Sequence, residues 1–394
     1  MMGDKKMESA WLFLFLISAF IIFWAMIGYP VTIYLIGKFL GDLSIDKDYE
    51  YEPTVTVMIV AHNEESVIYD KLLNAVNLDY PRHKLEILVS SDNSTDRTND
   101  IVKKFIESHP DYKIRLYEAQ ERKGKTNAQN EAAKTVTSEI LVMTDANAML
   151  DSKAIKEIVA SFYSDDVAYV TGRLCYINAN KSTTSASESL YWQWDLKMRE
   201  VESKLYSVTA GNGAIYACRT KDYYDFDPIR CHDSAMPIHY VLRGKRAIYN
   251  KEAVAYEKAG ENVKDEFSRK IRMSRNILNY WTSYFKVFNI FKYRWFSFCY
   301  FGHRFCRNNL WLAHIILLGT NFALVNKGII FSATLMLQLA FYMIAILKQF
   351  GIKSKLGSMV YYYVITVLAQ LIGAYRQATG KAKPFWEKAE STRV

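Results

Sequence analysis

The strongest constraint in the sequence is an uncharged apolar run near the start of the chain. Residues 11–36 contain no charged side chain across 26 positions, whereas an α-helix needs roughly 20 residues to cross a bilayer. We therefore predict a membrane span here, within an N-terminal segment of residues 1–49. A signal peptide is the alternative, but its apolar core is about 7 to 15 residues long and precedes a small-residue cleavage site.

Three more apolar blocks follow near the other end of the chain, at residues 310–325, 328–347 and 359–375. The middle block is long enough for a full crossing. The first and last are at the short limit of a span, so each can also be an interfacial or re-entrant segment. We predict two or three transmembrane helices within residues 310–375, followed by a basic tail at residues 376–394.

The net charge of +9 is concentrated just before these blocks. Residues 264–310 carry ten Lys and Arg side chains against two acidic ones, interleaved with aromatic residues. Such a mixture is typical of amphipathic helices on an anionic membrane surface, so we predict interfacial helices at residues 284–309 with anionic lipids as partners. Nucleic-acid binding is not expected, since no nucleic-acid-binding motif accompanies the charge.

The cysteines indicate the compartment. The five cysteines form no CxxC pair and show no metal-ligand spacing, which favours reduced, structural thiols. Together with the positive residues beside the apolar blocks, this predicts a multi-pass protein of the cell membrane with a cytoplasmic middle region. Three C-terminal crossings would place the basic tail outside, whereas two would keep it on the cytoplasmic side.

The region between the apolar segments alternates strands and helices. The β-branched runs predict four strands, at residues 54–61, 85–90, 114–117 and 140–144. Helical patterns separate these strands, at residues 67–76, 95–106 and 128–136. This order predicts an α/β fold with a mostly parallel sheet and helices on both faces. G-x-G-x-x-G and Walker motifs are absent, which argues against dinucleotide oxidoreductases and P-loop enzymes.

Beyond Asp151 the pattern changes. We expect a helix, a strand, a long helix and a second strand, the last three at residues 168–177, 187–206 and 213–218.

Polar side chains follow three of the predicted strands. Glu64, Asp92 and the pair Asp145 and Asn147 come where those strands end. In a parallel sheet these ends share one edge, where carboxylates and amides can hold a base, a ribose and a metal-bound diphosphate. The alternative for Asp145 and Asn147 is helix capping, a common use of both residue types.

Several motifs occur in a fixed order, namely VTVMIVAHNEE, SSDNSTD, ERKGKTNAQNEA, TDAN and CHDSAMPIHYVLRGKRAIYNKEAVAYE. Over residues 53–310 the chain thereby resembles membrane-bound glycosyltransferases of family 2, which include cellulose, hyaluronan and poly-N-acetylglucosamine synthases. The resemblance implies a GT-A catalytic domain, placed at residues 50–283.

The resemblance also assigns the donor side of the site. It implies that Asp92 contacts the nucleotide base and that Lys125 meets the donor diphosphate, with Asn130 fixing the loop. TDAN occupies the place of the family's DxD motif, so Asp145 and Asn147 would hold Mg²⁺ or Mn²⁺. Because an amide brings no charge, Asn147 should bind the cation more weakly than a carboxylate would.

The catalytic and acceptor side follows from the same resemblance. Asp233 aligns with the acid that removes the acceptor proton and, on sequence alone, could also be a helix N-cap. Arg269 and Arg272 would stabilise the departing diphosphate. Met273 replaces the tryptophan with which processive synthases hold the acceptor sugar. The loop of Gly211, Asn212 and Gly213 would border the acceptor. Trp192 would lie near the acceptor, although a core position is the better interpretation.

We therefore expect an inverting membrane glycosyltransferase that moves a sugar from a nucleotide donor, UDP-linked, to a lipid-linked or growing glycan acceptor. One alternative is a processive polysaccharide synthase that also secretes its product. A remoter alternative is a non-catalytic scaffold of a secretion complex. The sugar, the acceptor and the oligomeric state do not follow from the sequence.

Overall fold

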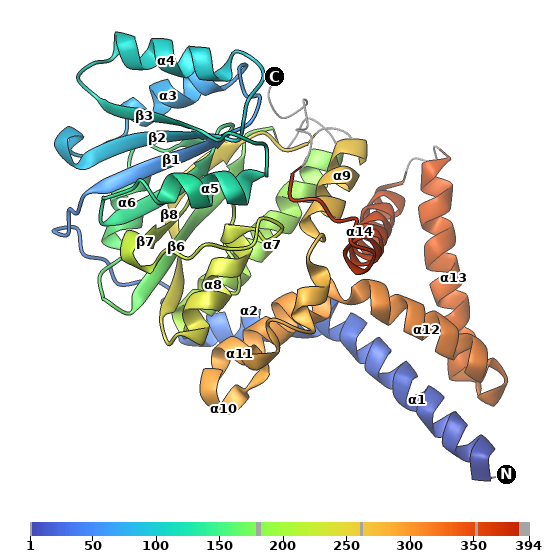
Figure 1. Ribbon diagram of the computed structural model, residues 1–394. Coiled ribbons are helices and arrows are strands. Elements are labelled where there is room, and N and C mark those ends of the chain that lie inside the picture. Colours follow the sequence, from blue (N-terminus) through green and yellow to red (C-terminus); the bar gives the residue numbers. More distant parts are fainter. Residues whose placement is uncertain (1, 179–182, 261–262, 351–353, 386–394) are drawn as a thin grey trace. The chain divides into compact units, whose positions relative to one another are not determined.

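The computed structural model describes residues 2–178, 183–260, 263–350 and 354–385. The chain divides into two units (Figure 1). The helical unit comprises Met1–Leu35, Val263–Ser283 and Phe298–Ala382. The sheet unit comprises Ile36–Asn262, Tyr284–Ser297 and Lys383–Val394. Each unit is therefore assembled from segments that are far apart in the sequence.

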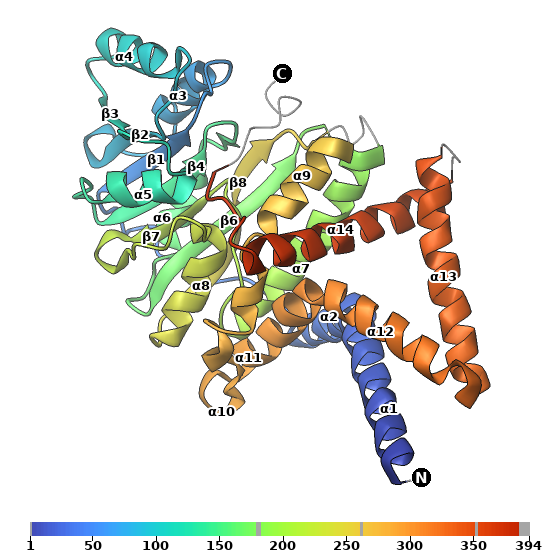
Figure 2. The same cartoon turned by 45° about the vertical axis from the view of Figure 1, so that its right-hand side comes forward.

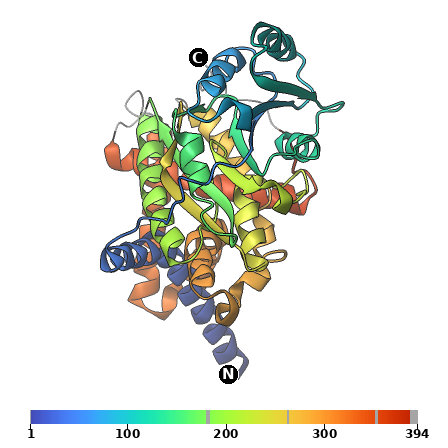
Figure 3. The ribbon, with the colours of Figure 1, turned by 90° about the vertical axis from the view of Figure 1, so that its left-hand side faces the viewer.

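The described part of the sheet unit contains an eight-stranded sheet in the order β3-β2-β1-β4-β7-β6-β8-β5. Figure 3 shows the ribbon turned by 90° from the view of Figure 1. The strands are β1 Val55–Ala61, β2 Leu85–Ser91, β3 Lys113–Glu118, β4 Ile140–Asp145, β5 Met149–Leu150, β6 Val167–Tyr176, β7 Tyr216–Arg219 and β8 Arg246–Glu257. Strands β1 to β4 pair in parallel, as do β6 and β8. Strand β7 is antiparallel to both of its neighbours, and β5 is antiparallel to β8. The predicted α/β fold with a mostly parallel sheet is confirmed.

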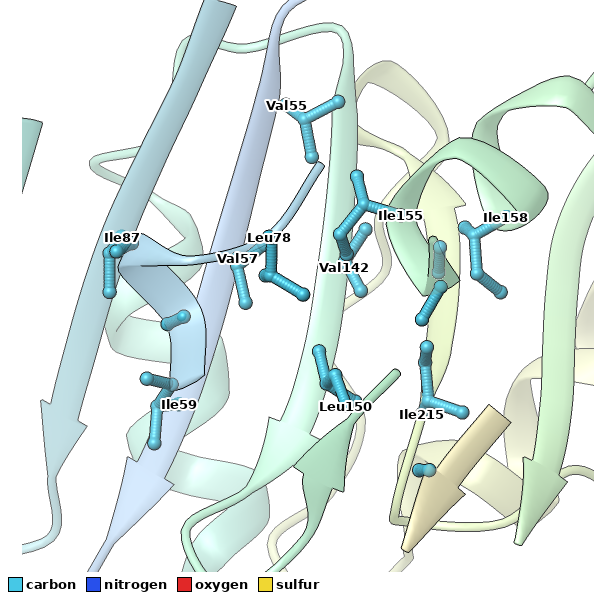
Figure 4. Close-up of a cluster of buried hydrophobic side chains, with 14 of the residues drawn as sticks. Val55, Val57, Ile59, Leu78, Ile87, Val142, Leu150, Ile155, Ile158 and Ile215 are labelled. Carbon is cyan, nitrogen blue, oxygen red and sulfur yellow. The ribbon is translucent and has the colours of Figure 1, made fainter. Parts of the chain in front are cut away.

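Helices cover both faces of this sheet. They are α3 Ile68–Val76, α4 Thr98–Ser108, α5 Lys125–Ala133, α6 Ala154–Ala160, α7 Thr183–Leu205 and α8 His232–Leu242. Side chains alternate along β1, so Val57 and Ile59 join the core under α3, α4 and α6 (Figure 4). Met58 and Val60 join the core under α5 and α8. Burial on both faces explains why this strand is a continuous apolar run.

The predicted last strand begins later than expected, at Tyr216 instead of residue 213. The reason is local hydrogen bonding. The side-chain oxygen of Asn212 accepts from the backbone N–H groups of Ala214 and Ile215, at 3.1 and 3.3 Å. These donors are thereby held in a loop and do not join the strand ladder.

Residues 284–297 of the sheet unit form short helical turns. These are the 3₁₀ turn η5 Phe285–Phe288, helix α10 Ile290–Tyr293 and the start of α11 Trp295–Cys299. Arg294 has a φ of 46°, which interrupts any longer helix. Phe285, Ile290 and Phe291 are exposed, the last at 94%.

The described helical unit contains long apolar helices. They are α1 Met2–Phe23, continued by a π-helical turn Trp24–Gly28 into α2 Tyr29–Leu40, and α12 Leu310–Leu324, α13 Ile329–Gln349 and α14 Lys355–Ala378 (Figure 2). Four stretches of the described chain are long and apolar enough to cross a membrane: Lys5–Leu40, Leu310–Lys327, Ile329–Gln349 and Leu356–Ala378. The N-terminal stretch is longer than the predicted span.

The remaining helix of this unit is short and charged. It is α9 Val263–Met273, followed by the 3₁₀ turn η4 Ile277–Tyr280, and both pack against α14. The five cysteines of the chain are free thiols, as expected.

Candidate active site

The carboxyl ends of β2 and β4 place two acidic residues at one edge of the sheet. Asp92 follows β2 and is buried. Its carboxylate accepts hydrogen bonds from the backbone N–H groups of Lys123 and Gly124, at 3.0 and 2.9 Å. Gly124 has a φ of 95°, a conformation that favours glycine. Asp92 therefore fixes the loop from which α5 begins.

Lys125, the first residue of α5, forms an ion pair with Asp145 at the end of β4. Burial alone lowers the pKa of Lys125, but the charges of Asp145 and Asp233 outweigh it and raise the pKa overall. Gly213 lies directly against this pair. A Cβ atom there would be 2.8 Å from Asp145 Oδ2 and 3.0 Å from Lys125 Nζ. The glycine thus leaves room for both charged groups.

Asp233 lies in the first turn of α8. Its backbone carbonyl accepts from Gly211 N–H at 2.7 Å and from the Tyr169 hydroxyl at 3.3 Å. Burial raises the pKa of the Asp233 carboxyl, Lys125 opposes this rise and Asp145 adds to it. Lys125, Asp145 and Asp233 therefore form one electrostatic cluster. Cys231 occupies the N-cap position of α8, so the alternative assignment of Asp233 as the N-cap is wrong.

His232 connects α8 to α5. It is buried, and its two ring nitrogens lie 2.9 Å from Gln129 Oε1 and from Asn130 Oδ1. Burial, together with the nearby Lys125 charge, lowers the pKa of His232 to about 3. The neutral ring holds the first turn of α8, and with it Asp233, at a fixed place beside α5. Asn130 also donates to the Phe226 carbonyl at 2.7 Å, which connects α5 to the segment before α8. The role of Asn130 in fixing the loop of Lys125 stays a prediction.

The loop after β4 is held by two residues that the sequence did not reveal. Asn147 Nδ2 donates to Glu257 Oε1 at 2.8 Å. Lys71 Nζ donates to Thr144 Oγ1 at 3.0 Å and to the Ala148 carbonyl. The capping alternative for Asp145 and Asn147 is wrong, because the N-cap of α6 is Lys153.

Lys71 is completely buried, and burial lowers its pKa to about 7, although Asp145 and Glu257 act in the opposite direction. A signal for it was present in the sequence. Ile68, Lys71, Leu72 and Ala75 have the spacing of one helix face, and the other three are apolar. Glu257 is the last residue of the motif that ends in AVAYE, but the motif does not indicate which loop it contacts, because that contact depends on the pairing of β5 with β8.

The predicted acceptor residues are well ordered within the sheet unit. Asn212 donates to the Gly172 carbonyl at 2.7 Å, which fixes the loop that also contains Gly211 and Gly213. Trp192 on α7 is buried, with the Arg199 guanidinium 5.4 Å from its ring centre. Arg199 in turn pairs with Asp195 at 2.6 Å. A core position for Trp192 agrees with these contacts.

Of the remaining predicted residues, Glu64 follows β1, the strand that lies between β2 and β4 in the sheet. Glu64 begins the turn into α3, where its backbone N–H donates to Thr98 Oγ1 at 2.8 Å. Arg269 and Arg272 are on α9 in the helical unit. Arg269 makes two hydrogen bonds to Glu266, at 2.8 and 3.0 Å. Burial raises the pKa of Glu266, but Arg269 and Lys270 outweigh it and lower the pKa to about 2. The donor roles of these residues stay predictions.

The residues at the β4 edge fit a cation that the substrate helps to hold. The described residues contain no group of three His, Cys, Asp or Glu side chains that could bind a metal by itself. Asp145 offers a carboxylate and Asn147 an amide oxygen. Mg²⁺ commonly binds through one or two carboxylates together with substrate phosphates and water, so this donor set is sufficient.

Comparisons with known proteins show what this chain is similar to. Residues 56–225 match the family described as Glycosyl transferase family 2. The chain is similar to the probable glycosyltransferase YdaM of Bacillus subtilis (strain 168), 29% identical over 265 residues that cover 63% of each chain. It is also similar to a beta-monoglucosyldiacylglycerol synthase of Nostoc sp., 28% identical over 163 residues that cover 41% of this chain and 35% of the relative. The matches thus span less than two thirds of these relatives.

A solved structure extends the likeness over almost the whole chain. The mannosyltransferase PcManGT from Pyrobaculum calidifontis, in complex with GDP-Man and Mn2+, superposes with a TM-score of 0.68. The superposition covers 93% of this chain and 99% of that one, at 22% sequence identity. The predicted GT-A fold is confirmed.

Proposed function

We propose that the chain is a glycosyltransferase that transfers a sugar, with inversion, from a UDP-linked donor to a lipid-linked or glycan acceptor. The match of residues 56–225 to the family described as Glycosyl transferase family 2 and the similarity to a probable glycosyltransferase support this proposal. The observation that carries this proposal is the clustering of Lys125, Asp145 and Asp233 at the carboxyl edge of the sheet. Such an edge is where open α/β sheets bind nucleotides.

The donor side combines a cation site with a fixed positive charge. Asp145 and Asn147 would hold Mg²⁺ or Mn²⁺, which neutralises the charge that develops on the leaving diphosphate. Lys125 is already paired with Asp145 and would turn toward the diphosphate when the donor binds. Asp92 keeps the loop of Lys123 and Gly124 in place and would contact the nucleotide base. Glu64, Arg269 and Arg272 complete the proposed donor contacts.

Asp233 would act as the general base. It accepts the proton of the acceptor hydroxyl while that oxygen attacks the sugar carbon from the face opposite the leaving group, which inverts the configuration in one step. The raised pKa of Asp233 makes it a stronger base than an ordinary aspartate. Because the base must be ionised, activity should fall as the pH drops through this raised pKa, above the ordinary value of 3.8.

The acceptor would be presented at a membrane surface. The helical unit supplies apolar helices of spanning length, and one relative is by its name a synthase of a glucosylated diacylglycerol. Exposed Phe285 and Phe291 alternate with Lys286 and Lys292, a mixture that suits an anionic lipid surface. Gly211, Asn212 and Gly213 would border the acceptor, whereas Trp192 is buried in the core. We place the catalytic region on the cytoplasmic side.

A processive synthase is the second candidate. Its support is a similarity to poly-beta-1,6-N-acetyl-D-glucosamine synthase of Staphylococcus epidermidis, 27% identical over 120 residues. The length of the product separates the two functions, since a single transferred sugar favours the simple transferase and long chains favour the synthase. A non-catalytic scaffold remains the third alternative and would be excluded by any turnover.

The first test compares purified full-length protein with Asp233→Asn. Each would be offered a panel of nucleotide sugars and a membrane lipid extract, with Mg²⁺, with Mn²⁺ and with a chelator. Loss of a general base should lower transfer by about 10²- to 10⁴-fold while donor binding stays near normal. The exposed Asp225→Asn serves as a charge-matched control and should keep full activity. Normal transfer by Asp233→Asn would refute the assigned base.

A further inference from the structure

The loop after β4 contains the proposed cation ligands Asp145 and Asn147 and is called the cation loop here. It carries an amide at position 147, where the family resemblance places a carboxylate. Asn147 can bind a hard cation only through its side-chain oxygen, because its NH₂ group is a donor. An amide that rotates freely would present the wrong end half of the time. The loop therefore needs a neighbour that fixes the orientation of Asn147.

Glu257 is that neighbour. It is the last residue of β8, and it reaches the loop because β5, which directly follows the loop, pairs with β8 through Met149 and Tyr256. The backbone carbonyl of Glu257 also accepts from Ile177 N–H at 3.0 Å, which fixes the end of the strand. Asn147 Nδ2 lies 2.8 Å from Glu257 Oε1. An ionised carboxylate only accepts hydrogen bonds, so the NH₂ group of Asn147 must face Glu257 and the oxygen must face away.

Glu257 also supplies the negative charge that an aspartate at position 147 would carry. Asp145 and Glu257 both act on the same buried ammonium group, that of Lys71, from which Thr144 Oγ1 is 3.0 Å away. Two carboxylates therefore stand beside this loop, as they would if residue 147 were an aspartate. The difference is that the second carboxylate belongs to a strand about a hundred residues further along the chain.

We propose that Glu257 is a positioning residue of the cation site. It holds Asn147 with its oxygen toward the cation and supplies the charge that an aspartate would have contributed at position 147. This inference rests on the proposed function, because it assumes that Asp145 and Asn147 hold a divalent cation. It predicts that cation binding is kept when Asn147→Asp and Glu257→Gln are combined, but not when only one of the two residues is changed.

The test measures Mn²⁺ binding directly, by the electron paramagnetic resonance signal of free Mn²⁺, with full-length protein in detergent and excess UDP. Glu257→Gln lets the amide of Asn147 turn and removes a charge, so the Kd for Mn²⁺ should rise by about 10- to 100-fold, the usual effect of losing an outer-shell partner. Asn147→Asp alone places two carboxylates side by side. The double variant Asn147→Asp with Glu257→Gln restores one donor and one carboxylate, so its Kd should return toward the wild-type value and not show the loss of about 10- to 100-fold.

Two controls separate the possible failures. Glu252→Gln changes an exposed glutamate on the same strand and should bind Mn²⁺ like the wild type. Asp145→Asn should lose the cation. If Asp145→Asn still binds normally, the proposed cation site is wrong and the inference falls with it. If Asp145→Asn loses Mn²⁺ while Glu257→Gln binds normally, or while the double variant fails to recover, only the role of Glu257 is refuted.

Discussion

Lys71 has the most unusual environment of the residues described at the candidate site. Its ammonium group is fully buried and bonds to Thr144 Oγ1 and to the Ala148 carbonyl. An isolated buried charge is expensive, but Asp145 and Glu257 compensate part of the cost. Lys71 thus supports the cation loop from the side of the core, while Lys125 contacts Asp145 from the side of α5.

The pKa of Lys71 predicts a pH dependence of stability. Its pKa is about 7 in the fold, against 10.5 for an ordinary lysine. Between these values the unfolded chain binds more protons than the folded chain, so the free energy of unfolding should increase as the pH rises from about 7 toward 10. The contribution is complete above the unfolded pKa and is lost as the pH falls through about 7, the pKa in the fold.

Lys71→Met should abolish this part of the pH dependence. The measurement is the Tm of the full-length protein in detergent with chelator, between pH 7 and 9. Lys104→Met on α4 changes an exposed lysine and should keep the wild-type slope of Tm against pH. Equal slopes for all three proteins would contradict the buried, partly discharged state of Lys71.

At the level of elements, the loop before β7 controls the space around the ion pair. Gly213 leaves no room for a side chain, since its Cβ would approach both Asp145 and Lys125 within about the distance of a hydrogen bond. Asn212 prevents the loop from moving away, because it is bonded to Gly172, Ala214 and Ile215.

Gly213→Ala should therefore force the ion pair apart while the fold stays intact. We expect at least about a tenfold loss of transfer activity, since misplacing catalytic groups by around 1 Å can cost 10²-fold. Gly260→Ala is the matched control, because a Cβ at position 260 meets no atom within 4 Å. Transfer rates with saturating donor provide the measurement. Full activity of Gly213→Ala would mean that the pair tolerates displacement.

The sequence predicted the elements that local patterns define. The β-branched strands, the helical periodicities and the carboxylates at strand ends lie where local sequence places them, with β1, β2 and β4 within a residue or two. The contacts of Lys71 with Ala148 and of Glu257 with Asn147 were not predicted, because they join segments that are distant in the sequence. Residues 284–309 were predicted as amphipathic interfacial helices. At residues 284–297, however, Arg294 with a φ of 46° divides the chain into short turns, a backbone state that periodicity does not reveal.

At the level of the whole molecule, the end of the described chain constrains the membrane topology. A Cβ at Gly124 would lie 2.5 Å from the Pro384 carbonyl oxygen, and the Arg122 guanidinium lies 5.0 Å from the Phe385 ring centre. Residues 383–385 belong to the same unit as residues 284–297, so we expect both segments to lie on the same side of a membrane. An even number of crossings would then separate residue 297 from residue 383, which predicts that no more than two of the helices α12, α13 and α14 cross.

Helix α14 is the one that we expect to lie at the surface. Tyr362 donates to Glu266 at 3.1 Å, and Gln377 accepts from Leu278 N–H at 2.8 Å. Between these contacts α14 extends for about 22 Å at 1.5 Å per residue. Over this length it packs against the charged helix α9 and the turn that follows. Because charged side chains are costly in the hydrocarbon core, we expect α9, and α14 with it, to lie outside that core.

Cysteine labelling tests this topology. Single cysteines would be introduced at Gly380, at Gly328 between α12 and α13, and at Asp225 in the sheet unit, after removal of the five native thiols. An impermeant maleimide should label positions 380 and 225 from the same side and position 328 from the opposite side. Labelling of position 380 together with position 328 would contradict an even number of crossings.

The division of the sheet unit into distant segments also sets the order in which the protein can mature. The loop of Gly124 meets Pro384 only after the intervening membrane helices have been synthesised. At about 5 to 20 residues per second, the roughly 130 residues between the end of β8 and Pro384 take on the order of 6 to 26 s to emerge. During that interval the nascent sheet unit lacks its C-terminal segment, so the apolar helices α12, α13 and α14 are synthesised before the contact of the Gly124 loop with Pro384 can form.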